Sequence, residues 1–245
     1  AAQGPDAVIR AVLESAGQAL DLAGVDSSAL EAIGVGAPGL SNSETGVVFT
    51  SPHLPGWQDI PLKDIIEKEF DKDTFIINDA DAAAIGECCF GAAKGASNFV
   101  YITISTGIGG GVVIGGKLYK GAGGIAGEVG HMTIDDKGPL CSCGNTGCWE
   151  TLASGTALAR EARRQIENGA RTSIIDHSDG DSEKITAQTV HVAAESGDAL
   201  AKDLIARTSH YIGVGLTNLI NIFNPELIVI GGGLSNIGDM LLAPA

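Results

Sequence analysis

Residues 128–150 read Glu-Val-Gly-His-Met-Thr-Ile-Asp-Asp-Lys-Gly-Pro-Leu-Cys-Ser-Cys-Gly-Asn-Thr-Gly-Cys-Trp-Glu, and the rest of the chain is organised around them. The segment brings together one imidazole, His131, and three thiols, Cys141, Cys143 and Cys148. These side chains form a complete tetrahedral ligand set for Zn²⁺, and thiolates favour zinc over Mg²⁺ or Ca²⁺. Four protein ligands leave no open coordination position, so we expect a structural zinc. The alternative is a group of reduced thiols with His131 placed elsewhere.

Two carboxylates bracket the same segment, Glu128 before it and Glu150 at its end. A carboxylate accepts hydrogen bonds from two adjacent hydroxyls, and a metal-bound imidazole keeps a second ring nitrogen for another contact. Glu128, His131 and Glu150 therefore suit a polyhydroxylated ligand held by a rigid loop.

The composition is that of an acidic globular protein. The chain has 245 residues, 44% apolar residues and a mean hydropathy of +0.19, which allows a large core in one domain or two smaller ones. The net charge of −15 argues against nonspecific binding of nucleic acid. We see no membrane-spanning run and no signal-peptide pattern, and we expect a cytoplasmic location. Cys88 and Cys89 lie in an alanine-rich stretch and are expected to be buried and reduced.

Hydrophobic periodicity predicts an α/β protein. Helices are expected at residues 7–23, 62–70, 82–93, 154–167, 187–195 and 198–222, and strands at 32–36, 47–49, 74–77, 99–104, 112–114 and 226–230. The proline-containing stretch 51–61 and the polar stretch 168–184 are expected to be irregular.

Polar or glycine-rich residues follow three of the predicted strands. Asn78 and Asp79 come directly after 74–77, and open α/β sheets bind ligands at such strand ends, although either residue alone also suits a helix cap. The run 107–111 lets backbone N–H groups approach a phosphate, or else forms only a hairpin turn. The second glycine run, 231–233, suits the sugar or base of a nucleotide.

Together these segments resemble the ROK family (repressors, open reading frames and kinases), and within it the glucokinases. The resemblance covers nearly the whole chain. It is carried by Gly36-Ala37-Pro38-Gly39, Leu54-Pro55-Gly56-Trp57, Asn78-Asp79-Ala80-Asp81, Thr106-Gly107-Ile108-Gly109-Gly110-Gly111, Ala126-Gly127-Glu128-Val129-Gly130-His131, Cys141-x-Cys143-Gly-x-x-Gly-Cys148-x-Glu150, Ala153-Ser154-Gly155-Thr156-Ala157, and Asn224-Pro225-Glu226 leading to Gly231-Gly232-Gly233.

The resemblance implies an actin-like, ribonuclease-H-like fold of two α/β domains. We place a small N-terminal domain at residues 1–94 and a large domain at 95–245, which carries the zinc loop 128–150. Asp79 would be the catalytic base. The hexose contacts would be Gly39, Asn78, Asp79, Glu128, His131 and Glu150. The phosphate turn would include Thr106, Gly107 and Gly109, and the nucleotide loop Gly231, Gly232 and Gly233.

The implied reaction is ATP-dependent phosphorylation of a hexose, glucose to glucose 6-phosphate, with Mg²⁺ accompanying ATP and a dimer or tetramer as the assembly. The alternatives are a kinase for fructose, N-acetylmannosamine or N-acetylglucosamine, and a sugar-responsive repressor, which would need a helix-turn-helix. The family opens with an Asp-x-Gly-Gly-Thr phosphate turn that these residues lack, and it continues beyond Gly233. We therefore expect a chain incomplete at both ends. His53 and Asp81 stand where the family more often has Asn.

Overall fold

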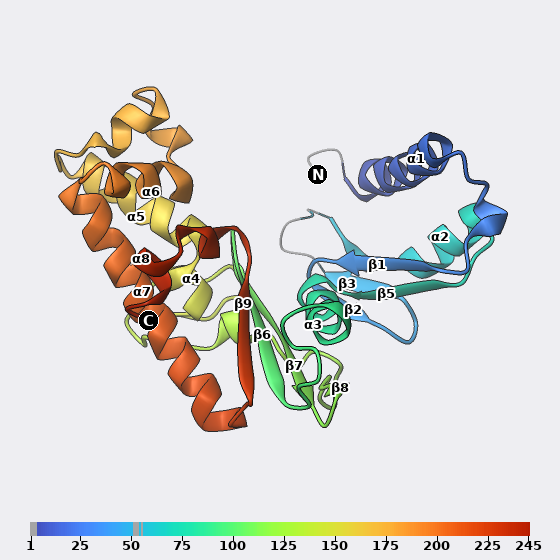
Figure 1. Cartoon of the computed structure of the whole chain (residues 1–245). Helices are drawn as coiled ribbons and strands as arrows, with labels where there is room; N and C mark the ends of the chain where they lie inside the picture. The colour runs from blue at the N-terminus through green and yellow to red at the C-terminus, as the bar shows by residue number, and fades with distance from the viewer. Residues whose placement is uncertain (1–3, 51–53, 55) are drawn as a thin grey trace. The chain divides into compact units, whose positions relative to one another are not determined.

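The computed structural model describes residues 4–50, 54 and 56–245 (Figure 1). The chain divides into two compact units. The first contains Ala1–Gly86 and Tyr119–Ala126, and the second contains Glu87–Leu118 and Gly127–Ala245. His53 and Pro55, which belong to the family-like loop, lie outside the described residues.

The first unit contains two small sheets. Strands β1 (Ile33–Ala37) and β5 (Thr74–Asn78) pair in parallel, with Ala37 opposite Asn78. Strands β2 (Leu40–Asn42), β3 (Val47–Thr50) and β4 (Gln58–Ile60) form an antiparallel sheet. The helical elements are α1 (Pro5–Ala23), η1 (Ser27–Ala29), α2 (Leu62–Phe70) and α3 (Asp79–Phe90), and the last of these runs on into the second unit.

The core of the first unit forms where α2 and the apolar face of α1 pack on these strands. Helix α2 buries Leu62, Ile66 and Phe70, at the spacing of one helix face. Helix α1 buries no residue completely, and its apolar side chains are only partly covered by the same cluster. The core residues are Ala37, Val48, Trp57, Leu62, Ile66, Phe70 and Ile76.

The second unit is built on a four-stranded sheet in the order β8-β7-β6-β9. Strand β6 (Phe99–Ile104) pairs antiparallel with β7 (Ile108–Ile114) and parallel with β9 (Leu227–Gly231), and β8 (Lys117–Leu118) extends the β7 edge. The helices are α4 (Trp149–Ala153), α5 (Gly155–Glu167), α6 (Ala187–Glu195), α7 (Ala199–Phe223) and α8 (Asp239–Leu242). Shorter 3-10 turns are η2 (Val129–His131), η3 (Ser173–Ser178), η4 (Ser182–Lys184) and η5 (Gly233–Ile237).

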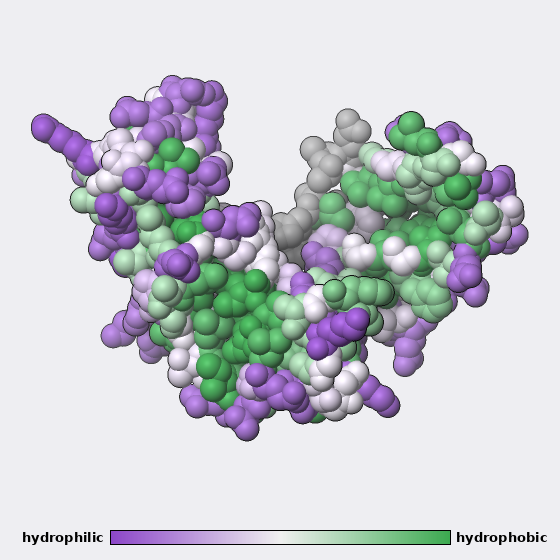
Figure 2. Space-filling view, viewed as in Figure 1, coloured by the Kyte–Doolittle hydropathy of each residue, from purple (hydrophilic) through white to green (hydrophobic). Residues whose placement is uncertain are grey.

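Strand β9 lies at an edge of this sheet, beside the end of α7. On the face shown in Figure 2, apolar residues gather over these two elements, and Ile220 and Ile222 of α7 are 49% and 64% exposed. Among the described residues, no helix combines the length and apolar character needed to span a membrane.

The structure corrects several sequence predictions. Residues 58–60 form β4, not a loop, and residues 108–111 belong to β7, not to a turn. Helix α3 begins at Asp79, three residues before its predicted start, and the polar stretch 168–184 contains η3 and η4. Cys89 is exposed and Cys88 only half-buried, so neither is the buried packing residue that the alanine-rich context predicted.

Candidate functional site

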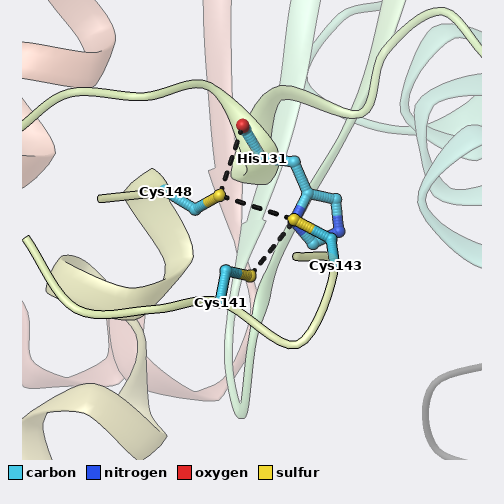
Figure 3. Close-up of side chains that lie close together, drawn as sticks. All are labelled: His131, Cys141, Cys143 and Cys148. Carbon is cyan, nitrogen blue, oxygen red and sulfur yellow. Dashed lines mark hydrogen bonds between the residues drawn. The ribbon is translucent and has the colours of Figure 1, made fainter. Parts of the chain in front are cut away.

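The predicted zinc ligands lie together in the second unit (Figure 3). One ligand atom from each of His131, Cys141, Cys143 and Cys148 lies within 4.8 Å of all the others. Sγ of Cys141 is 3.6 Å from Nδ1 of His131, and Sγ of Cys143 is 3.7 Å from Sγ of Cys148. Ligands at zinc–sulfur and zinc–nitrogen distances of roughly 2.3 and 2.0 Å are separated by about 3.5–3.8 Å in a tetrahedron. The four residues therefore fit a tetrahedral zinc ion.

Tight turns fold the loop around this cluster. The amide of Cys141 donates to the Asn145 carbonyl at 2.7 Å, and the amide of Gly144 donates to the Cys141 carbonyl at 3.0 Å. Gly147 has a φ of +67°, and a Cβ built on it would lie 1.6 Å from the Asp135 carbonyl oxygen. Only glycine fits there, because the backbone is in the left-handed conformation and any side chain would collide with the Asp135 carbonyl.

A buried tryptophan fastens the loop to the core. Trp149 follows the ligand Cys148 and is fully buried, and its amide donates to the Met132 carbonyl at 2.8 Å. A Cβ on Gly215 of α7 would lie 2.1 Å from the indole ring, so the tryptophan packs directly on α7 only because position 215 has no side chain. The start of α4, with Glu150, is thereby held beside the residue that follows His131.

The electrostatic environment of the thiols differs along the loop. Burial, together with contact with Cys143 and Cys141, raises the pKa of Cys148 to about 12. A backbone hydrogen bond at Asn145 lowers the pKa of the exposed Cys143. Three adjacent thiolates repel one another, so a bound cation is what allows them to be deprotonated together.

Glu150 supports the turn between β6 and β7. The amide of Ile108 donates to Oε2 of Glu150 at 2.9 Å, and a Cβ on Gly107 would lie 2.1 Å from the same oxygen. The amides of Gly155 and Thr156, at the start of α5, donate to the carbonyls of Ser105 and Thr106. The turn Ser105–Gly107 is thus held between a carboxylate and a helix N-terminus. Glu128 is exposed and immediately precedes η2, which carries His131.

The other predicted sugar-binding residues lie in the first unit. Asn78 ends β5, and its Oδ1 accepts from the amides of Ala80 (2.9 Å) and Asp81 (3.2 Å) while its Nδ2 donates to the Gly39 carbonyl (3.3 Å). Asn78 therefore does cap α3, as the alternative interpretation held, and also ties the Gly39 turn to the strand end. Asp79 is the first residue of α3, and its Oδ1 accepts from the amide of Ala80 at 3.0 Å.

An ion pair that the sequence did not predict lies next to Asp79. The side chain of Asp81 is only 5% exposed, and it pairs with Lys120 from the segment Tyr119–Ala126. Burial raises the pKa of Asp81, and the negative charge of the nearby Asp79 also raises it. The contact with Lys120 lowers the pKa and so opposes both effects. The pair crosses 39 positions of sequence, so no local pattern indicated it.

A cavity of about 400 Å³ opens at the carboxyl ends of β6 and β9. Its walls come from the Ser105–Thr106 turn, the start of α5 and residues of η5. Parallel strands direct their carboxyl ends to one edge of a sheet, which is where α/β proteins bind nucleotides. Helix N-termini at such an edge favour phosphate groups.

Two of the six predicted nucleotide-binding residues, Thr106 and Gly233, line this cavity. Gly231 ends β9, and Gly232 follows it with a φ of +90°. A Cβ built on Gly232 would lie 2.4 Å from the Ile104 carbonyl oxygen, so both glycines lie against β6. Gly109 lies within β7, opposite Thr103, and not in a turn. Sequence reasoning did not assign most of the cavity lining, which includes the polar side chains of Thr156, Arg163, Gln188 and Asn236. Of these four, only Thr156 carried a signal, through its family-like motif.

An α/β protein with a nucleotide-sized cavity at a strand edge and a Cys₃His cluster in the same unit has the framework of a nucleotide-dependent enzyme or of a regulator derived from one. The ROK family pattern matches residues 3–244, and the chain belongs to the ROK family.

Similar proteins include both enzymes and regulators. A glucokinase from Halalkalibacterium halodurans is 43% identical over 218 residues, which are 89% of this chain and 66% of that enzyme. A xylose repressor from Caldicellulosiruptor bescii is 38% identical over 210 residues, which are 86% of this chain and 52% of the repressor.

The crystal structure of a ROK family glucokinase from Streptomyces griseus in complex with glucose and AMPPNP aligns with a TM-score of 0.87 and 35% identity, covering 98% of this chain and 76% of that one. The chain therefore has the α/β fold of this family, that of the actin-like ATPases. It spans somewhat less than two thirds of the length of the first glucokinase and about half of the repressor.

Proposed function

We propose that the protein is an ATP-dependent hexose kinase that converts glucose to glucose 6-phosphate, with Asp79 as the general base. The observation that carries the proposal is Asp79 itself: a carboxylate at the carboxyl end of β5, in a chain that also has a nucleotide-sized cavity. A protein that only sensed a sugar would need neither a base nor a nucleotide site. The similarity to glucokinases supports the same activity.

The chemistry requires a base because a sugar hydroxyl is a poor nucleophile at neutral pH. A carboxylate that accepts a hydrogen bond from the hydroxyl orients it and takes its proton as the phosphoryl group transfers. One oxygen of Asp79 is engaged by the Ala80 amide, which fixes the rotamer of the side chain. The remaining oxygen would receive the proton. Mg²⁺ bound with ATP would neutralise phosphate charge.

The proposed hexose contacts are the backbone of Gly39 and the side chains of Asn78, Asp79, Glu128, His131 and Glu150. Zinc at His131, Cys141, Cys143 and Cys148 would be structural, since all four of its positions are filled by protein. Its contribution would be to fix the imidazole of His131 and the start of α4, and so to organise the sugar-binding loop in advance.

Phosphate binding would use the turn Ser105–Gly107. Glu150 and the two amide-to-carbonyl contacts of α5 hold this turn in place, so its backbone would not need to reorganise during the reaction. The adenosine would occupy the 400 Å³ cavity beside Gly233.

The test is Asp79→Asn in the whole gene product that carries this sequence, assayed for ADP formation with glucose. We expect kcat to fall by at least about a thousandfold, because the amide cannot take the proton, while glucose binding by calorimetry changes less than about threefold. Asp73→Asn is the matched control: an exposed aspartate of the same unit, just before β5. Turnover retained in Asp79→Asn would remove Asp79 as the base.

The similarity to xylose repressors supports a second candidate, a sugar-responsive regulator. The same assay separates the two, since a regulator binds sugar without consuming ATP. A panel of glucose, fructose, N-acetylmannosamine and N-acetylglucosamine then identifies the substrate by the highest kcat/KM. Sugar binding with no ATP turnover on any of them would favour the regulator.

A further inference from the structure

A second cavity, of about 550 Å³, lies in the second unit on the side of α5 away from the nucleotide cavity. Helix α5 contributes Leu158, Glu161 and Arg164 to this cavity, and Thr156, Ala159 and Arg163 to the other. The remaining walls come from α7, α4 and residues 135 and 137–139 of the zinc loop. Nothing in the proposed kinase reaction uses it.

Cationic side chains are concentrated around this cavity. Four of the fifteen lysines and arginines of the chain line it, Lys137, Arg160, Arg164 and Arg207, against two carboxylates, Asp135 and Glu161. The chain as a whole carries twice as many acidic as basic residues, 30 against 15. The cavity therefore carries a local excess of positive charge in a protein whose net charge is −15. Such an excess favours an anionic ligand.

The three arginines of the cavity form hydrogen bonds within the second unit. Glu161 accepts two hydrogen bonds from Arg164, at 2.8 and 2.6 Å, and a weaker one from Arg207 at 3.3 Å. These contacts, led by the hydrogen bond from Arg164, lower the pKa of Glu161 to about 2, so the carboxylate stays ionised. Arg160 donates to the Thr151 carbonyl. Within residues 4–50, 54 and 56–245, no carboxylate forms an ion pair with Lys137 or Arg160.

The remaining lining suits a small organic molecule. Leu152, Leu158 and Leu204 form an apolar wall, and Thr208 and Tyr211 stand on α7 beside Arg207. Guanidinium groups match phosphate oxygens with paired hydrogen bonds, and Lys137 adds an unpaired charge. The volume exceeds what inorganic phosphate fills, since a drug-sized ligand occupies a pocket of about 300–1,000 Å³.

We propose that this cavity binds a small phosphate monoester, with Lys137 and Arg207 contacting the phosphate and the leucine wall covering the carbon skeleton. The site is separate from the nucleotide cavity, and α5 is the wall between them. A ligand that braces α5 on one side acts on the helix that supports the Ser105–Gly107 turn on the other.

The test is calorimetric titration of the chain with glycerol 3-phosphate at fixed ionic strength, in the presence of saturating AMPPNP so that the nucleotide cavity is filled. Binding does not require phosphoryl transfer, so the result is independent of the proposed kinase activity. We expect glycerol 3-phosphate to bind, inorganic phosphate to bind at least fivefold more weakly, and glycerol not to bind.

The diagnostic variant is Lys137→Gln with Arg207→Gln, in which Arg164 still neutralises Glu161. Its matched control is Lys184→Gln with Lys202→Gln, which removes the same charge from exposed positions of the same unit outside the cavity. We expect at least a tenfold loss of affinity in the first double variant and less than a twofold change in the second, with both retaining the parent's circular dichroism.

Three outcomes would overturn the proposal. Equal weakening in both double variants would mean that only general charge attraction was measured. Inorganic phosphate that binds as tightly as the ester would mean an anion site without selectivity for a carbon skeleton. A change in molecular mass for Lys137→Gln with Arg207→Gln, with ester affinity unaltered, would mean that the cavity faces another copy of the chain.

Discussion

At the scale of single residues, the Asp81–Lys120 pair has the clearest structural consequence. Asp81 lies two positions after the proposed base on α3, and its Oδ1 is buried without a hydrogen-bond partner among the described residues. The ion pair with Lys120 is therefore the main interaction that offsets the cost of burying the Asp81 carboxylate. The pair joins the segment Tyr119–Ala126 to the N-terminal turn of α3, where the position of Asp79 is set.

Lys120→Met is expected to destabilise the protein by about 2–3 kcal/mol, because it leaves a buried carboxylate without its cation. Urea unfolding at pH 7 measures the change. Lys117→Met, an exposed lysine three positions earlier, is the matched control and should cost less than about 0.5 kcal/mol. If both variants lose the same stability, the pair does not hold α3.

The same variant has a predictable pH dependence. Burial raises the folded-state pKa of Asp81, so the protonated form is favoured by folding, and its stabilising effect is present at low pH and lost as the pH rises through the folded pKa. Removing Lys120 raises that pKa further, since the lysine opposes the shift. The deficit of Lys120→Met relative to the parent should shrink as pH falls from 7 toward 4.5, and Asp81→Asn with Lys120→Met should abolish that pH dependence.

At the scale of elements, strand β7 shows how far local patterns reach. Residues 107–111 contain four glycines, a composition typical of a turn, yet Ile108–Gly111 pairs with β6. Glycine is needed there because a Cβ on Gly110 would lie 2.7 Å from a methyl carbon of Val129, in the segment that leads to His131. That contact joins residues nineteen positions apart, so no local pattern predicted it. The periodic helix α2, by contrast, was predicted to the residue.

The zinc loop was predictable for a different reason. Its four ligands lie within one short segment, and their chemistry alone indicates the ion. The 550 Å³ cavity, by contrast, is lined by side chains of the zinc loop, α5 and α7, so no single stretch of sequence predicts it. The ligand set also gives a direct prediction.

Cys148→Ser is expected to lower bound zinc from about one ion per chain to well below half of that, and to cost at least about 2 kcal/mol of stability, because one thiolate of the tetrahedron is lost. Metal analysis of the purified chain and thermal unfolding measure the two effects. Cys89→Ser, an exposed cysteine outside the cluster, should change neither. A zinc-free parent that is fully folded would contradict the assignment.

At the scale of the whole molecule, the described residues form two hydrophobic cores, one in each compact unit, and each unit carries some of the proposed ligand contacts. Sequence reasoning assigned most of these contacts through the family resemblance, not through periodicity, since residues such as Gly39 and Asn78 come together only when β5 lies beside β1. Because the nucleotide cavity belongs to the second unit alone, the two ligands should affect the molecule differently.

Hydrogen exchange measured by mass spectrometry tests this difference. AMPPNP alone should slow exchange at the turn 105–107, at the start of α5 and at η5, all in the second unit, because those residues line or support the nucleotide cavity. Glucose should slow exchange at residues 78–81 of the first unit and 128–150 of the second, since the proposed contacts come from both. Trehalose at the same concentration is the control for nonspecific solute effects. Glucose protection confined to the second unit would contradict Asp79 as the base, which would then be sought among the carboxylates of that unit, with Glu128 and Glu150 as the first variants to examine. Protection confined to the first unit would leave Asp79 in place and contradict the proposed contacts from Glu128, His131 and Glu150.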